Sequence, residues 1–383
     1  MIEQLSYTNL QHLWWLLCSV VGALFLFLTF VQGGQSLLWQ VAKTQTEKDL
    51  VINSLGRKWE LTFTTLVLFG GALFASFPKF YSTSFGGAYW VWVLILFTFI
   101  IQAVSYEYRK KPWNIFGSLV YELFLFINGS VGILLIGAAV GTFYTGSNFQ
   151  ISDYNFVTWT HPFRGLEAAL SPSVSSIFNI AMGLFLVFNA RTLGAMYLVN
   201  SIDLGEAPEM ETRLRSASWQ NFVLSLPFCL LILGSLLFMP GYGIVDAQGT
   251  IDIVSFKYLR NLLANPWLIG LLVAGLVLLI VGVWKTARTS ETGGIWFGGL
   301  GTVLVGLTVL LLPAYNNTAF YPSKSDLQSS LTIYNASSSP YTLKVMTYVA
   351  IAIPFVLAYV AYVWWAMNRG KIKIEDTGDR AAY

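Results

Sequence analysis

Ionisable side chains are scarce in this chain of 383 residues. Only 11% of the residues are Asp, Glu, Lys or Arg, whereas 55% are hydrophobic and 16% are aromatic. A soluble domain carries roughly 25% charged residues. Together with the mean hydropathy of +0.62, this shortage excludes a water-soluble fold and indicates a membrane protein.

Histidine and cysteine are also rare, with two of each. A b-type haem in a helical bundle commonly takes two axial ligands. His12 opens the first apolar stretch and His161 lies in a loop, so a haem shared between them is not expected. Cys18 and Cys229 fall inside apolar stretches, where packing is their expected role. We therefore expect the chain alone to bind neither haem nor metal.

Known catalytic motifs are missing as well. The sequence holds no GxxxxGK phosphate loop, no HExxH zinc motif, no CxxC pair and no GxSxG elbow. Taken alone, the chain is predicted to lack redox and hydrolytic activity, and nothing in it predicts binding to nucleic acid.

The apolar residues are gathered in about nine stretches, each close to the roughly 20 residues that a helix needs to cross a bilayer. This pattern predicts an all-α, polytopic membrane helix bundle, with residues 1–370 as a single transmembrane domain and 371–383 as a polar cytoplasmic tail. The predicted spans are 13–38, 61–80, 88–106, 114–141, 172–199, 218–240, 266–284, 293–313 and 343–366.

The cationic residues fall mainly on one side of these spans. Lys and Arg concentrate in cytoplasmic loops, so the distribution predicts an extracytoplasmic N-terminus and a cytoplasmic C-terminus. The predicted cytoplasmic group is Lys43, Lys48, Arg57, Lys58, Arg109, Lys110, Lys111, Arg191, Arg213, Arg215, Lys285, Arg288, Arg369, Lys371, Lys373 and Arg380, against Lys79, Arg164, Lys257, Arg260, Lys324 and Lys344 on the other side.

Two further features concern packing. The loops near 142–170, 240–265 and 314–342 are long enough for small ordered structure, and we expect all three on the extracytoplasmic face. Glycines four residues apart occur in the fourth span, at Gly137 and Gly141, and in the eighth, at Gly294 and Gly298. Missing side chains at this spacing let helix backbones approach closely.

Three acidic residues in or near the spans are candidates for a proton path. Glu122 lies inside the fourth span near its cytoplasmic boundary. Glu60 and Glu107 lie at the cytoplasmic ends of the second and third spans, near basic residues in the sequence. Interfacial ion pairing, which contributes little stability, and a carboxylate relay for cytoplasmic protons explain these positions equally well.

Several segments resemble subunit II of the cytochrome bd-type quinol oxidases. The most specific is the run 330–346, SLTIYNASSSPYTLKVM, which contains Asn335. The others are WWLL at 14–17, the region from Ile52 through Trp59 and Glu60 to the segment 70–75, and YEYRK at 106–110. The resemblance extends over the whole chain, although the fifth to seventh spans match mainly in hydropathy.

The resemblance implies a division of labour in a bacterial inner-membrane heterodimer. A larger subunit I would carry two b haems, one d haem and the quinol site, while subunit II binds no haem. The complex would oxidise quinol, reduce dioxygen to water and take protons from the cytoplasm, so that turnover is electrogenic. Subunit II would contribute packing, a proton route and, in some relatives, a bound structural quinone or lipid. Whether small single-helix subunits join is left open.

Trp59, Glu60 and Glu107 match positions where the family has a tryptophan and two acids, and the family's acids are proposed to conduct protons. Two further acids of the family are replaced here by Gln32 and Gln35, which cannot titrate. These two glutamines share a helix face, so we expect them to hydrogen-bond to a neighbouring helix.

Two other departures affect the expected routes. Gln102 stands where an arginine is usual, and Thr65 stands where some relatives have a tryptophan linked to an oxygen path. No oxygen channel is therefore predicted in this subunit. The alternative functions are a secondary transporter, which would show paired inverted repeats, and a non-catalytic membrane scaffold.

Overall fold

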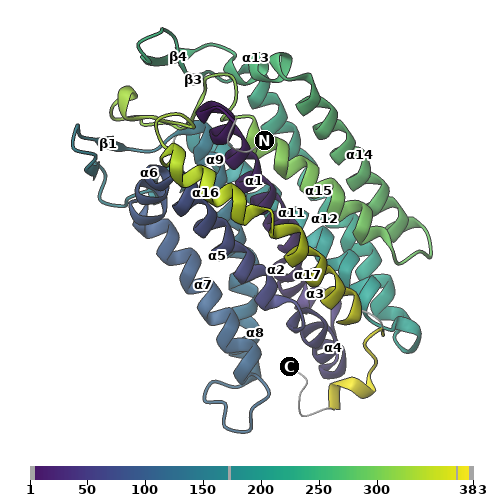
Figure 1. Ribbon diagram of the computed structural model, residues 1–383. Helices are drawn as coiled ribbons and strands as arrows, with labels where there is room; N and C mark the ends of the chain where they lie inside the picture. Colours follow the sequence, from purple (N-terminus) through teal and green to yellow (C-terminus); the bar gives the residue numbers. More distant parts are fainter. Residues whose placement is uncertain (1–4, 171–173, 368–369, 379–383) are drawn as a thin grey trace.

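The computed structural model describes residues 5–170, 174–367 and 370–378. Within this part of the chain, nine helices are long and apolar enough to cross a membrane, which confirms the predicted all-α polytopic bundle. Their long axes run roughly side by side (Figure 1). The nine spans are Tyr7–Ser36, Gln45–Ser76, Tyr89–Tyr108, Ser118–Thr145, Ser176–Ser201, Pro208–Phe238, Pro266–Arg288, Gly294–Leu311 and Pro340–Ala366.

Four of the spans are built from more than one helical segment. The first consists of α1 (Tyr7–Leu28) and α2 (Phe30–Ser36), and the second of α4 (Gln45–Gly56) and α5 (Trp59–Ser76). The fourth consists of α8 (Ser118–Ile127), the π-helical turn η3 (Asn128–Gly132) and α9 (Ile133–Thr145), and the ninth of α16 (Pro340–Ala350) and α17 (Ile353–Met367).

The other spans are single helices, joined by short helical segments. The spans are α7 (Tyr89–Tyr108), α11 (Val174–Ser201), α12 (Pro208–Phe238), α14 (Pro266–Arg288) and α15 (Gly294–Leu311). The short segments are α3 (Leu38–Val41), α6 (Pro78–Tyr81), η2 (Ser82–Gly86), α10 (Leu166–Leu170), η4 (Leu204–Glu206), α13 (Lys257–Ala264), η5 (Leu327–Ser329) and η6 (Glu375–Gly378).

Three antiparallel hairpins occupy the three long loops, which confirms that these loops hold small ordered structure. The pairs are β1 (Phe149–Ile151) with β2 (Val157–Trp159), β3 (Gly241–Ile244) with β4 (Ile251–Val254), and β5 (Ala319–Tyr321) with β6 (Leu331–Thr332). Figure 1 shows β1, β3, β4 and α13 at one end of the bundle and α4 at the other.

Local sequence signals explain where two of the helices begin. Thr44 accepts a hydrogen bond from the backbone N–H of Glu47, whose carboxylate accepts from the backbone N–H of Thr44, and this capping box starts α4. Ser339 caps α16 by accepting from the N–H of Thr342, and Pro340 occupies the first turn, where no backbone donor is needed.

Glycine permits the closest helix contacts, as the sequence predicts. A Cβ atom added to Gly137 would lie 2.7 Å from the Cα atom of Gly183, and one at Gly294 would lie 2.4 Å from the carbonyl oxygen of Gly282. The closest approach joins α2 to α11, where a Cβ at Gly33 would lie 1.9 Å from the carbonyl oxygen of Ala190. Any larger residue at these positions would push the helices apart.

The described residues after the last helix, 370–378, are not detached from the bundle. Ile372 is 3% exposed and packs into the apolar core around α4 and α11. Its backbone N–H donates to the carbonyl oxygen of Ser201, and its carbonyl accepts from the N–H of Asp203. The described beginning of the polar tail is thus fixed to the end of the bundle that holds α4.

Candidate functional site

Glu122 lies at the centre of a buried cluster of charged residues near the end of the bundle that holds α4. One carboxylate oxygen is 3.0 Å from Nη2 of Arg109, and the other is 2.8 Å from Nζ of Lys48. The indole N–H of Trp39 donates to the same carboxylate at 3.2 Å. Arg109 also binds Asp49 at 2.7 Å. Both carboxylate oxygens of Glu122 are therefore engaged.

The chain brings this cluster together through two separate segments. Arg109 ends α7, and the turn that follows reverses the chain at Gly117, whose φ of +77° favours glycine. Glu122 then faces back toward Arg109 from the second turn of α8. Lys48 and Asp49 come from α4, far away in the sequence. The sequence identified Glu122 as a candidate but did not identify these partners.

Glu60 and Glu107 do not join this cluster. Both residues are exposed, on α5 and α7, and neither forms an ion pair with another described residue. They do share a neighbourhood, because the residues just before them, Trp59 and Tyr106, stack with ring centroids 5.7 Å apart. The two acids thus flank one aromatic pair that joins α5 to α7.

Interfacial ion pairs of Glu60 and Glu107, one of the two alternatives that the sequence left open, are therefore not found among the described residues. Residues two apart on a helix point in different directions, so Arg109 turns inward to Glu122 while Glu107 turns outward. Lys58 lies over the ring of Trp364, with 4.8 Å from Nζ to the centroid. The roles of Glu60, Glu107 and Glu122 in a proton path stay predictions.

Gln32, Gln35 and Gln102, the three glutamines that stand where the resembled family has charged residues, form a buried amide cluster between α2 and α7. Nε2 of Gln32 lies 3.4 Å from Oε1 of Gln102, and Nε2 of Gln35 donates to the hydroxyl of Tyr106 at 2.8 Å. All three glutamines are at most 1% exposed. This arrangement places Gln32 and Gln35 against a neighbouring helix, as expected from their shared face. The cluster contains no titratable carboxylate.

Asn335 holds the turn within the segment 330–346. Its Oδ1 atom accepts from the backbone N–H of Thr332 at 2.8 Å, and its Nδ2 atom donates to the carbonyl of Ser330 at 3.0 Å. The same turn receives Gln11 of α1, which donates to the carbonyl of Tyr334. Asn335 therefore fixes a loop against the start of the first span, by local hydrogen bonds that its short amide allows.

The two histidines have separate surroundings. Nε2 of His12 lies 3.4 Å from the hydroxyl of Tyr334. Nδ1 of His161 accepts from the backbone N–H of Phe163 and lies 3.8 Å from the carboxylate of Glu167. Among the described residues, no group of three or more His, Cys, Asp or Glu side chains could hold a metal ion.

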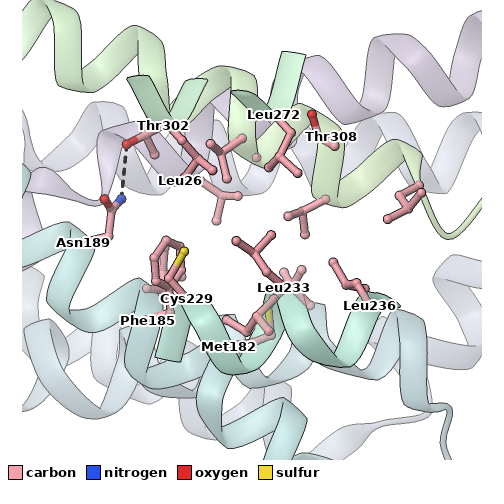
Figure 2. A pocket seen from close by; sticks show the side chains of 18 of the residues that line it. Leu26, Met182, Phe185, Asn189, Cys229, Leu233, Leu236, Leu272, Thr302 and Thr308 are labelled. Atoms are coloured by element: carbon pink, nitrogen blue, oxygen red, sulfur yellow. Dashed lines mark hydrogen bonds between the residues drawn. The ribbon is translucent and has the colours of Figure 1, made fainter. Parts of the chain in front are cut away.

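A cavity of about 370 Å³ lies between α11 and α12 on one side and α14 and α15 on the other (Figure 2). Most of its wall is aliphatic, as at Leu233 and Leu272. The polar side chains Asn189 of α11 and Thr302 of α15 meet at one end of the cavity, with 3.2 Å from Nδ2 to Oγ1 (Figure 2). The volume and the apolar lining are typical of sites for small apolar ligands.

Sequence reasoning did not find this cavity. Its wall is made of the residue types that fill ordinary helix interfaces, and it is contributed by helices from both halves of the chain. Whether such residues fill the space between the helices or leave a cavity depends on tertiary packing. The sequence therefore gives no signal for this cavity.

The chain is similar to known proteins over almost its whole length. The family described as "Cytochrome bd terminal oxidase subunit II" matches residues 10–367. Cytochrome bd-I ubiquinol oxidase subunit 2 of Escherichia coli (strain K12) is 27% identical over 388 residues, covering 97% of each chain. Cytochrome bd ubiquinol oxidase subunit 2 of Bacillus subtilis (strain 168) is 22% identical, covering 94% of this chain and 96% of that protein.

A solved structure shares the fold. A chain of the bd oxidase from Geobacillus thermodenitrificans superposes with a TM-score of 0.66 at 13% identity, covering 95% of this chain and 100% of that chain. At this identity the likeness concerns the helix arrangement alone.

Proposed function

The chain belongs to the cytochrome bd terminal oxidase subunit II family, and on this premise we propose that it is the haem-free second subunit of a quinol oxidase. It would lie in a bacterial inner membrane beside a larger subunit I. The b and d haems held by subunit I would supply the electron transfer from quinol to dioxygen. The family match over residues 10–367, together with the nine spans in the described part of the chain, carries this proposal.

The proposed orientation follows from the charges. The end of the bundle that holds α4 (Figure 1) carries most of the Lys and Arg residues. Since positive loops stay in the cytoplasm, we assign this end to the cytoplasmic side and the three hairpins to the outer side.

We further propose that Glu60 and Glu107 help to deliver cytoplasmic protons to the complex. Both carboxylates are exposed at the proposed cytoplasmic end, where they can exchange protons with water and with a partner subunit. A relay through Glu122 would require its pair with Arg109 or Lys48 to open first, because both carboxylate oxygens are engaged. We therefore assign the faster exchange to Glu60 and Glu107.

The cavity between α12 and α14 is the proposed place for an apolar chain, either the tail of a quinone or that of a lipid. Its wall offers hydrocarbon contacts over most of its area. An apolar chain in this cavity would stabilise the packing of four helices and would take no part in electron transfer.

Deletion of this chain tests the central proposal. Membranes that lack it should lose quinol-driven oxygen consumption and the absorption band of d haem, and both should return on expression of the chain from a plasmid. Unchanged oxygen consumption by this oxidase in the deletion membranes would contradict the proposal.

A further inference from the structure

Four amide atoms inside the bundle have no hydrogen-bond partner among the described residues. They are Oε1 of Gln32, Oε1 of Gln35, Nε2 of Gln102 and Oδ1 of Asn128. The three glutamines form the amide cluster between α2 and α7, and Asn128 begins the π-helical turn η3. All four side chains are at most 1% exposed. Their polar atoms are therefore closed off from bulk water.

Asn128 lies beside the amide cluster. Its Nδ2 atom donates to the hydroxyl of Thr98 at 3.3 Å, and Thr98 lies one turn before Gln102 on the same face of α7. The next residue, Gly129, packs closely on α2, because a Cβ atom added to it would lie 2.2 Å from the carbonyl oxygen of Gln32. The segments α2, α7 and η3 therefore meet at one place, and each contributes unpaired amide atoms to it.

The hydrogen bonds between these side chains do not use their full capacity. A primary amide carries two donor hydrogens and an acceptor oxygen. The Gln32–Gln102 contact measures 3.4 Å and the Asn128–Thr98 contact 3.3 Å, whereas typical N–H···O hydrogen bonds measure about 2.7–3.2 Å. The amides are thus loosely paired. Because a buried polar group without a partner is unfavourable, the site favours a small polar molecule that supplies the missing hydrogen bonds.

Two membrane spans depart from regular α-helix at this place. The first span breaks at Thr29, between α1 and α2, and Gln32 lies in the first turn of α2. The fourth span passes through the π-helical turn η3, which begins at Asn128. Water that inserts into the hydrogen-bond ladder is one of the causes of such breaks. The helix geometry and the unpaired amides therefore point to the same kind of ligand.

We propose that the amide cluster and Asn128 bind about two ordered water molecules, since a buried water makes about three hydrogen bonds. The four unpaired atoms are three acceptors and one donor. Water can both donate and accept, whereas an anion would face three acceptors. A metal ion would be buried among neutral amides without a carboxylate to balance its charge. The contacts lie within this chain, so the water site does not depend on the proposed oxidase function.

Tyr106 provides a reporter for this water. Its side chain is 3% exposed, and its hydroxyl accepts from Nε2 of Gln35 at 2.8 Å. A water molecule at Oε1 of the same amide therefore lies close to the tyrosine ring. Tyr258 is the matched comparison, because it is 0% exposed and its hydroxyl donates to the carbonyl of Tyr144 at 2.8 Å.

Radiolytic footprinting of the purified complex, with its partner subunit present, tests the proposal. A short X-ray pulse converts bound water to hydroxyl radicals, which oxidise the adjacent side chains, and mass spectrometry then measures the oxidation of each tyrosine. We expect Tyr106 to be oxidised about tenfold faster than Tyr258, because a buried water reaches only the side chains beside it. A structure of the complex at a resolution that shows ordered water should place water within hydrogen-bond distance of at least two of the four amide atoms.

Two variants test whether the amides hold the water. Gln35→Leu removes the unpaired oxygen next to Tyr106 and should slow the oxidation of Tyr106 by about fivefold, since water needs polar partners to stay in a buried site. Gln45→Leu is the matched control, because Gln45 is an exposed amide on α4, and it should leave the rate unchanged. Both variants are compared at the haem content of the unmodified complex, which excludes a misfolded sample.

Three results would overturn the proposal. The first is an oxidation rate of Tyr106 in the unmodified complex no higher than that of Tyr258. The second is a rate in Gln35→Leu equal to that of the unmodified complex. The third is a map at that resolution in which the four amide atoms have no water beside them. None of these readouts depends on oxygen consumption, so an inactive complex that holds the water would contradict the proposed oxidase function and not the water site.

Discussion

Arg109 and Glu122 face each other across the turn between α7 and α8, with 3.0 Å between Nη2 and Oε1 and each side chain only 1% exposed. Lys48 and Asp49 extend this pair to α4, so four charged side chains connect three helical segments. Two buried charges that satisfy each other are tolerated, whereas one that has lost its partner is costly.

Glu122→Gln should therefore destabilise the protein. The change leaves Arg109 with Asp49 as its remaining acid and removes the partner of Lys48. Removing one member of a buried ion pair costs about 3–5 kcal/mol, and we expect the lower end because Lys48 is 22% exposed. Thermal unfolding of the purified complex measures the loss.

Glu209→Gln is the matched control for this change. Glu209 pairs with Arg213 at 3.6 Å but is 90% exposed, and exposed pairs contribute about 0–1 kcal/mol. Equal melting temperatures for the two variants would show that the Glu122 cluster does not hold the fold.

The amide cluster predicts a non-additive pair of substitutions. Gln102→Leu removes the acceptor of Gln32 and leaves a buried amide without its partner, which costs about 1–3 kcal/mol. Adding Gln32→Leu removes that orphaned group, so the double variant should be more stable than the sum of the single changes predicts. A double-mutant cycle of thermal stability measures this coupling.

A coupling energy of zero would show that these glutamines do not interact. If the single variants also keep full assembly and oxygen uptake, the glutamines have no role beyond filling space.

Glu107→Gln should slow turnover more than it impairs assembly, because an amide cannot pass a proton on. We expect oxygen consumption per haem to fall by about tenfold, less than the ~10²–10⁴-fold effect of one general acid or base, because water has access to this exposed carboxylate. The measurement is quinol-driven oxygen uptake normalised to haem content. Glu375→Gln, an exposed acid on η6, serves as control. Normal uptake by a fully haem-loaded Glu107→Gln complex would remove Glu107 from the proton path.

Glu167 should make the stability of the hairpin end depend on pH. Burial raises the pKa of its carboxyl. A folded-state pKa above the unfolded value means that the stabilising contribution is fully present below the unfolded pKa, about 4.3, and is lost as the pH rises through the folded pKa. Glu167→Gln has no carboxyl to ionise, so this variant should not lose stability as the pH rises.

Thermal unfolding between acidic and neutral pH provides the comparison. Glu167→Gln should be more stable than the unmodified chain at neutral pH, and the difference should shrink at acidic pH. The same pH slope for both proteins would contradict a raised pKa for the carboxyl of Glu167.

The helical spans and their close glycine contacts could be predicted because bilayer thickness and missing side chains act locally. The partners of Glu122 could not, because Lys48 and Asp49 reach it only through the folding of α4 against α7 and α8. Glu107 illustrates a related difficulty. Its sequence neighbour Arg109 points to the other side of the helix, so proximity in sequence did not predict an ion pair. Ile372 docks through backbone hydrogen bonds, and no side-chain pattern in the sequence predicts these bonds.

Purification of the affinity-tagged chain, followed by a reduced-minus-oxidised optical spectrum, tests the central claim most directly. The account predicts a larger partner subunit, b- and d-haem bands in the complex, and haem that stays with the partner when the subunits are separated. A colourless chain isolated alone from membranes that contain the oxidase, or an iron porphyrin ligated by this chain itself, would contradict it.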